Sequence, residues 1–421
     1  MKVNLFAKTV SALFIGYFCI LFNFPQAQSQ CSVSSNCLDL GDPQEYTTIE
    51  SSVSDPLTFQ FLIATGKLLD ATNSLIMPQR LIICGPIVAN LVQYTFASGS
   101  EIIFVDNSSG ITVNTNCRLE FKGTHIHGCT QLWRSLRVFG RLDIVEGCKI
   151  EDAINAVQLN DGSTFVSSMS EYDGNYISIY AGAAVLPPNV SVSLAGFTIT
   201  GSTFVGAKPL LQSYTPPGTT EVYTAPNTGI LTENVSAIQV GVPSALTNIF
   251  RDFQSPNSGI SPIPVRGIRA RKSNLTVQNC TFRNIGMTDG SSLGFGVSGI
   301  STTGTHSVTV TGLGGTASSP STFENVYRAV SAESVRLFVS HCRVVGCNLG
   351  IFERRSSSLN SGVFQINIHH NRIENACFNG IQLQNTMPSK SVIIADNWIA
   401  FNQTGILCTD KRRGYCKALS V

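Results

Sequence analysis

Three stretches near the C-terminal end of the 421-residue chain share one pattern: VSHCRVVGCNLGIF (339–352), IHHNRIENACFNGIQ (368–382) and IADNWIAFNQTGIL (394–407). Each has a polar or Cys residue, a spacer, an aliphatic residue, a short polar run and a Gly-Ile pair. The aliphatic residues are Val344, Ile373 and Ile399, at spacings of 29 and 26. Elsewhere short alternating apolar runs, separated by Gly, Asn and Ser, dominate the sequence, which is typical of β-strands. The repeat therefore predicts an all-β, single-stranded solenoid of about ten coils.

Weaker copies of the repeat occur upstream, and aligning all copies on the aliphatic position produces columns of equivalent residues. The position two residues before the aliphatic residue should face inward at a turn. It is occupied by Cys148, Cys280, Cys342, Asn371 and Asn397. We expect a ladder of hydrogen-bonding side chains here, with thiols filling the same slot as amides. A column of reactive thiols is the alternative.

The repeat resembles the right-handed parallel β-helix superfamily, which includes pectate lyases. The segment LWRSLRVFGRLDIVEGCKIEDAINAVQL (132–159) is also similar to exported bacterial β-helix proteins of unknown activity. The resemblance covers residues 115–408 with gaps and implies the fold more specifically than a function. Lyases of this superfamily often hold Ca²⁺ between carboxylates, so the resemblance makes one acidic set a candidate for a metal site: Asp143, Glu146, Glu151 and Asp152.

The pattern predicts four segments along the chain. They are a signal peptide (1–29), an N-terminal cap region (30–95), a parallel β-helix (96–408) and a C-terminal tail (409–421). Segments rich in Pro, Ser, Thr or Gly predict loop insertions in the β-helix near 209–228, 252–265 and 286–320.

The N-terminal segment has a basic start, an apolar run at 10–24 and small residues before a possible cleavage point, as secretory signal peptides do. Its removal takes Lys2 and Lys8 and leaves a mature chain of net charge zero, with no integral membrane span. This gives no reason to expect nucleic acid as a partner. The chain has 13 Cys, and an exported protein can form disulfides. We expect two local pairs, Cys31–Cys37 and Cys408–Cys416.

Three residues before the aliphatic position stand His341, His370 and Asp396, on successive coils. They could serve as a general base or bind a metal, or they could be turn residues that bond to one another.

The position just before the aliphatic residue holds Arg343, Arg372 and Trp398, which should point outward. Arginine pairs with carboxylates and tryptophan stacks on sugar rings, so this stripe suits an extracellular polysaccharide. An ordinary solvated face is the alternative.

Glu353 stands at a slot that is apolar in other coils. Such a break in a local rule indicates either a functional residue or a buried carboxylate partnered by Arg354 or Arg343. His125 and His127 lie two residues apart on one expected strand. No third ligand is evident beside them, so we interpret them as structural.

The signatures of polygalacturonases, glycosidases with paired carboxylates and P-loop proteins are absent from the sequence. We therefore expect a secreted or cell-surface scaffold that binds glycans or mediates adhesion, with no cofactor. One alternative is a polysaccharide lyase that acts by β-elimination on an acidic glycan, with Ca²⁺ as a possible cofactor. A structural part of a larger surface protein is another. The lyase candidates are His341, His370, Arg343, Arg372 and Glu353.

Overall fold

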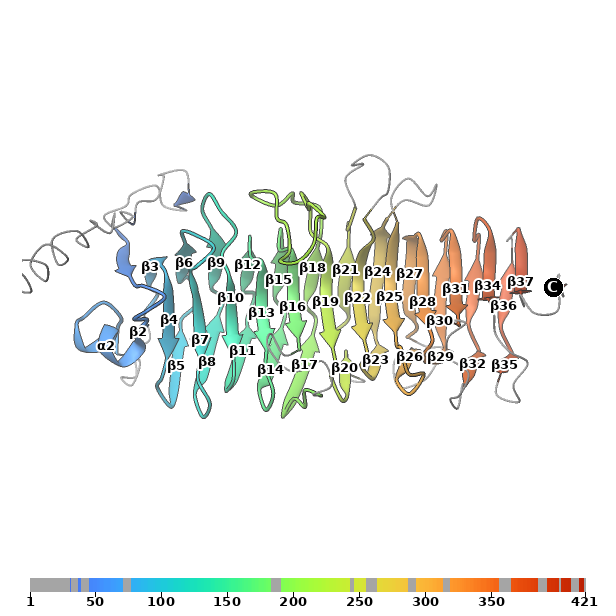
Figure 1. The fold of residues 1–421 in the computed structure, drawn as a ribbon, viewed down its shortest axis with the longest axis horizontal. Helices are drawn as coiled ribbons and strands as arrows, with labels where there is room; N and C mark the ends of the chain where they lie inside the picture. Colours follow the sequence, from blue (N-terminus) through green and yellow to red (C-terminus); the bar gives the residue numbers. More distant parts are fainter. Residues whose placement is uncertain are drawn as a thin grey trace, which may run out of the picture. The chain divides into compact units, whose positions relative to one another are not determined.

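In a computed structural model of the chain, the strands from β1 to β37 wind in successive coils that stack on one another (Figure 1). The chain divides into two compact units, Met1–Ser32 and Val33–Val421. The predicted signal peptide, residues 1–29, lies outside the described residues. These are 31, 37–38, 45–70, 77–182, 191–242, 246–254, 263–286, 293–312, 319–355, 365–384, 392–400, 403–409 and, for the backbone, 416–419.

Among the described residues, each coil from β3 to β35 contributes one strand to each of three faces, whereas the first coil (β1, β2) and the last (β36, β37) contribute to two. The 13-stranded sheet A consists of β1 (Thr47–Glu50), β3 (Arg80–Cys84), β6 (Glu101–Phe104), β9 (His125–Gly128), β12 (Lys149–Glu151), β15 (Glu171–Asp173), β18 (Thr203–Val205), β21 (Asn248–Arg251), β24 (Cys280–Ile285), β27 (Ser321–Val326), β30 (Cys342–Val345), β33 (Arg372–Glu374) and β36 (Trp398–Ala400).

Sheet B is the second face. Its 14 strands are β2 (Leu57–Thr58), β4 (Pro86–Ala89), β7 (Gly110–Val113), β10 (Ser135–Val138), β13 (Asn155–Leu159), β16 (Ile177–Ala181), β19 (Thr228–Glu233), β22 (Val265–Arg271), β25 (Gly294–Ile300), β28 (Arg328–Glu333), β31 (Leu349–Arg354), β34 (Asn379–Gln384), β37 (Thr404–Thr409) and β38 (Cys416–Leu419).

The third face is divided into two sheets. Sheet C consists of β5 (Gln93–Phe96), β8 (Arg118–Lys122), β11 (Arg141–Val145), β14 (Thr164–Ser168) and β17 (Gly196–Thr200). Sheet D consists of β20 (Ile238–Val240), β23 (Leu275–Gln278), β26 (Ser307–Thr311), β29 (Arg336–Ser340), β32 (Ile366–His369) and β35 (Val392–Ala395).

All strand pairs in the described residues are parallel except β37 with β38, which closes the last coil of sheet B within the predicted tail. The all-β solenoid prediction is confirmed. The longest all-parallel sheet has 13 strands, so the stack has more coils than the ten expected. The extra coils come largely from the predicted cap region, where β1 to β4 already pair in the same sheets.

The predicted aliphatic column is one continuous inward row of sheet A. Val344, Ile373 and Ile399 are directly paired on successive coils. Upstream the row continues through stacked aromatic rings, with centroids 4.5 to 4.9 Å apart and planes within 11° of parallel. These rings belong to Tyr172, Phe204, Phe250, Phe282 and Phe323. The row forms the centre of the buried core.

Glycines of sheet B make room for these rings. A Cβ on Gly267 would lie 2.8 Å from Phe282 Cδ1, and one on Gly296 would lie 2.7 Å from Phe323 Cδ1. Gly296 belongs to β25, inside the segment 286–320 that was predicted to be a loop insertion. Both β25 and β26 are ordinary coil strands, and the glycine content of β25 reflects packing against the phenylalanines rather than a loop.

The predicted ladder at the turn before sheet A is present. Asn371 Nδ2 donates to Val339 O at 2.9 Å and to Asn397 Oδ1 at 2.9 Å, and Asn371 Oδ1 accepts from the Cys342 amide at 3.0 Å. The Cys342 thiol lies in the same slot and donates to Ser340 O at 3.4 Å. Each coil thus satisfies the backbone of its neighbour at this buried corner.

Burial makes the thiols of the ladder unreactive. It raises the pKa of Cys148 to about 11 and that of Cys280 to about 12, and it also raises the pKa of Cys342. A reactive thiolate column would need lowered pKa values.

A short helix lies where the stack begins. In α2 (Phe59–Ala64) the Thr58 side chain accepts a hydrogen bond from the Phe61 amide, as an N-cap does. Phe59 packs edge-on against Tyr94 of β5, with centroids 5.0 Å apart. The helix thus covers part of the first coils, the role expected of a cap.

Of the other two predicted insertions, the first lies within the described residues and the second largely does not. The segment near 209–228 links β18 to β19 and contains an antiparallel bridge between Tyr214 and Tyr223. The prediction at 252–265 falls largely on residues 255–262, which lie outside the described residues.

Both predicted disulfides are wrong. Cys37 is bonded to Cys129, which follows β9 and lies 92 residues away in the sequence. Cys408 carries a free thiol, and the register of β37 with β38 places it opposite Lys417 rather than Cys416. Proximity in the sequence was a poor guide because winding brings residues of distant coils together.

The aromatic row yields a stability prediction. Replacing Phe282 by alanine removes a ring stacked on both sides and should lower the free energy of unfolding by about 3–5 kcal/mol, measured by denaturant unfolding. Phe378→Ala is the control, because Phe378 is 52% exposed and should cost under about 0.5 kcal/mol. Equal losses in the two variants would contradict the packing described here.

The ladder yields a reactivity prediction. At pH 8 a thiol of pKa about 11 is thiolate in roughly one molecule per thousand, so an alkylating reagent should modify exposed Cys377 of the folded protein first. Cys148 and Cys280 should react only on unfolding or as the pH approaches their raised pKa values. Peptide mapping by mass spectrometry reads the outcome, and equal labelling at pH 8 would restore the reactive-column alternative.

Candidate functional site

The stripe predicted on sheet A is brought together by the fold. Arg343, Arg372 and Trp398 are paired on successive coils, and the Arg372 guanidinium lies 4.6 Å from the centroid of the Trp398 ring. Arg343 Nη1 is 3.6 Å from Glu324 Oε1, and Arg372 Nη2 is 2.9 Å from Glu374 Oε1. Carboxylates of the same face therefore partly neutralise the stripe.

The row of His341, His370 and Asp396 occupies turn positions with φ between 53° and 56°, in the left-handed region. The His341 and His370 rings stack with centroids 5.2 Å apart. His370 Nε2 is 3.8 Å from Asp396 Oδ2, and His370 Nδ1 is 2.7 Å from Nδ1 of His369. Burial and the neighbouring histidines lower the pKa of His341. The geometry is that of turn residues in mutual contact.

Glu353 lies in the core. It is fully buried and paired in register between Ala332 and Leu383, at the apolar slot that the repeat indicated. Arg354, considered as its partner, pairs instead with Glu333 at 2.9 Å. A side chain in this position cannot reach a substrate on the surface.

The acidic set does not converge on one point. Asp143 is buried between two arginines of sheet C. Glu146 is an exposed turn residue beside a lysine. Glu151 and Asp152 both accept hydrogen bonds from Lys208 Nζ at 3.0 Å. The set is thus divided among separate ion pairs.

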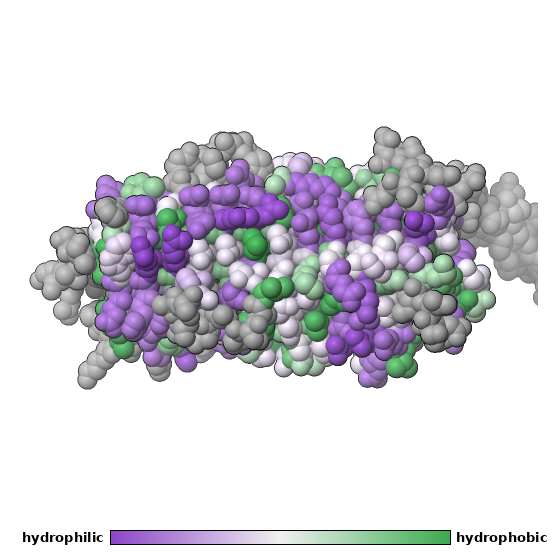
Figure 2. All heavy atoms as spheres, turned by 180° about the vertical axis from the view of Figure 1, so that it is seen from behind, coloured by the Kyte–Doolittle hydropathy of each residue, from purple (hydrophilic) through white to green (hydrophobic). Residues whose placement is uncertain are grey.

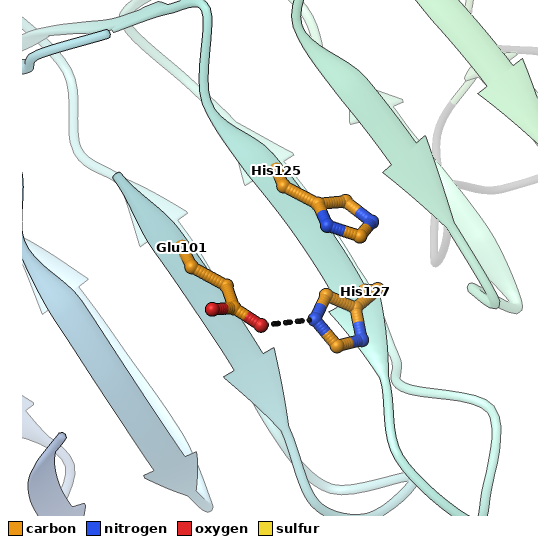
Figure 3. Close-up of side chains that lie close together, drawn as sticks. All are labelled: Glu101, His125 and His127. Atoms are coloured by element: carbon orange, nitrogen blue, oxygen red, sulfur yellow. Dashed lines mark hydrogen bonds and ion pairs between the residues drawn. The ribbon is translucent and has the colours of Figure 1, made fainter. Parts of the chain in front are cut away.

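Glu101 lies beside His125 and His127, for which no third ligand was evident in the sequence. His125 and His127 stack with ring centroids 4.3 Å apart, and His127 Nε2 lies 3.0 Å from Glu101 Oε1 (Figure 3). Glu101 precedes His125 by one coil and is paired with it in register. A repeat alignment extended upstream of residue 115 could have found it.

The structure contains a second cationic site, on sheet B, which was not predicted from the sequence. Arg266, Phe295 and Arg328 are paired on three successive coils of the outward face. The Arg266 guanidinium lies 5.4 Å from the Phe295 centroid, and that of Arg328 lies 5.5 Å from Phe295 and 4.3 Å from Phe352. These residues line a hollow of about 220 Å³, which we call the arginine pocket. Its remaining lining residues include Ser298, Ser331, Glu333 and Arg354.

The arginine pocket is short of negative charge. Arg354 is paired with Glu333 at its edge, but in the part of the chain that the structure describes no carboxylate lies within ion-pair distance of Arg266, Arg269 or Arg328. Burial lowers the pKa of Arg266 to about 9, with a contribution from Arg269, and also lowers the pKa of Arg328. The Nε atoms of Arg269 and Arg328 are buried without a hydrogen-bond partner. Such poorly solvated cations favour an anion beside them.

The segment between β18 and β19 lies against sheet B upstream of this pocket. Its Tyr214 and Tyr223 each pack on Tyr176, with ring centroids 4.8 Å apart. Lys208 at its start is anchored to Glu151 on sheet A. The predicted insertion therefore contributes aromatic rings to sheet B and is not in contact with the Arg343–Trp398 stripe in the described residues.

The sequence signal for the arginine pocket is weak. VRGIRAR (265–271) places three arginines on one strand, but GFGVSGI (294–300) and RAVSAE (328–333) look unrelated to it. Only the register of the coils puts Phe295 between two guanidiniums. On the side of the molecule opposite the view of Figure 1, hydrophilic residues form broad areas and hydrophobic residues appear as small separate patches (Figure 2).

Comparison with known proteins supports the fold and no particular activity. Residues 266–417 match the family model described as the right handed beta helix region. No curated protein and no solved structure compared with the chain gave a match. No helix among the described residues is long and apolar enough to cross a membrane. Together with the parallel sheets that continue on both sides of residue 266, this match supports a right-handed parallel β-helix fold.

Proposed function

We propose that this protein is a secreted or cell-surface scaffold that binds an acidic polysaccharide through the arginine pocket of sheet B. The observation that carries the proposal is the pair of guanidiniums on either side of Phe295, without a carboxylate partner in the described residues. Disulfide bonds, such as Cys37–Cys129, are compatible with an extracellular location.

The chemistry of the pocket suits a sugar that carries carboxylates. A guanidinium offers two parallel N–H donors, which match the two oxygens of a carboxylate. Phe295 and Phe352 supply flat apolar surface, on which the less polar face of a sugar ring can lie. Unlike Arg343 and Arg372, these cations have not already been neutralised by glutamates of their own face.

A polymer suits the site better than a small anion. Coils of a parallel stack repeat at about 4.8 Å, so Arg266 and Arg328, which hold equivalent positions two coils apart, lie about 10 Å from each other along the face. Upstream on the same sheet lie the tyrosines packed around Tyr176. The mature chain's net charge of zero argues that binding depends on this local cluster rather than on the whole protein.

Binding can be tested with one variant and one matched control. Arg328→Gln removes the charge between Phe295 and Phe352 and should weaken retention of polygalacturonate, alginate or chondroitin about tenfold or more. Arg372→Gln removes an equivalent charge from the stripe on sheet A and should leave retention unchanged. Affinity electrophoresis at two salt concentrations provides the measurement, with an uncharged glycan as the reference ligand.

The opposite result has a clear meaning. If Arg372→Gln abolishes retention and Arg328→Gln does not, the ligand lies on the stripe and the proposal is wrong. The same incubations, followed by the absorbance of unsaturated uronides, test the alternative of β-elimination. Product formation that is lost in His370→Ala would favour a lyase over a binding scaffold.

A further inference from the structure

We propose that Glu101, His125 and His127 form a binding site for a divalent transition-metal ion such as Zn²⁺. One ligand atom of each residue lies within 4.8 Å of the others. The site is on sheet A near the start of the stack, built from β6 and β9 (Figure 3). It is separate from the arginine pocket and independent of glycan binding.

The hydrogen bond of His127 to the backbone fixes which nitrogen faces Glu101. Nδ1 of His127 lies 2.9 Å from Gly128 O, and a carbonyl oxygen can only accept, so Nδ1 carries the proton. The lone pair of the neutral ring is therefore at Nε2, 3.0 Å from Glu101 Oε1. Two acceptors at this distance need a cation between them, which is either a proton or a metal ion.

Glu151 and Tyr46 orient the other two proposed ligands, His125 and Glu101. His125 Nε2 lies 2.8 Å from Glu151 Oε2, so Nδ1 is the nitrogen that this ring would offer to an ion. Glu151 also accepts a hydrogen bond from Lys208 Nζ at 3.0 Å, so it is an acceptor beside His125 as well. Tyr46 donates to the second oxygen of Glu101. A carboxylate or carbonyl behind each ligating histidine is the usual outer shell of a zinc site.

The donor set selects the kind of ion. Two imidazoles with one carboxylate suit Zn²⁺ and its first-row neighbours, whereas Ca²⁺ prefers oxygen ligands alone. Ligand atoms around tetrahedral zinc are roughly 3.4 Å apart, so side-chain shifts of about 1 Å would close the site. The Glu101 and His127 side chains are 5% and 9% exposed and that of His125 is 26% exposed, which leaves an approach past His125.

Zinc titration of the chelator-treated full-length protein tests the proposal. Calorimetry at pH 7.5 should show one ion per chain, with affinity at least tenfold weaker in Glu101→Gln and in His127→Ala. His370→Ala, in the second histidine cluster, is the control and should bind as the wild type does. Affinity should fall at acidic pH, because protons compete with the ion for the imidazole nitrogens.

A spectroscopic readout separates loss of the site from loss of the fold. Co²⁺ in place of Zn²⁺ should give visible absorption bands of a four-coordinate site, and these should disappear in His125→Gln, whose melting temperature should stay near that of the wild type. The proposal is overturned if the wild-type protein binds zinc no more tightly than His127→Ala. It is equally overturned if His370→Ala is the variant that loses the ion.

Discussion

The structure depends on one packing constraint, the stack of aromatic rings against glycines in the core. Phe250, Phe282 and Phe323 lie nearly parallel and less than 5 Å apart, and each faces a sheet B glycine that has no Cβ to displace it. A one-residue slip between coils would turn every inward side chain outward. The ring stack therefore keeps the coils in register, although the loops between them vary in length.

Register in turn determines which surface residues become neighbours. Arg266 and Arg328 lie on strands separated by a whole coil, yet both guanidiniums meet Phe295 because the intervening strand is paired with both. The same rule brings Glu101 beside His125 and Arg372 beside Trp398. Side chains that recur at equivalent positions of successive coils suit ligands that are themselves repetitive. In the arginine pocket such side chains also carry positive charge that no carboxylate of the described residues neutralises.

Much of the core could be predicted from the sequence, because the repeat is regular where the coils are short. Val344, Ile373 and Ile399, the Asn371–Asn397 ladder and the apolar slot of Glu353 all followed from aligning three stretches. The first coils could not be predicted in this way, because the apolar runs of β1 to β4 lack the Asn residue and the Gly-Ile pair that identify the repeat. The disulfide of Cys37, the partner of His125 and the arginine pocket all depend on contacts between coils that the repeat does not align.

The most direct test of glycan binding at the arginine pocket is a crystal structure of the protein with a bound oligosaccharide of uronic acids. We expect a carboxylate within hydrogen-bond distance of the Arg266 or Arg328 guanidinium, with a sugar ring against Phe295 or Phe352. A ligand seated over Arg343, Arg372 and Trp398, with the arginine pocket left empty, would contradict it.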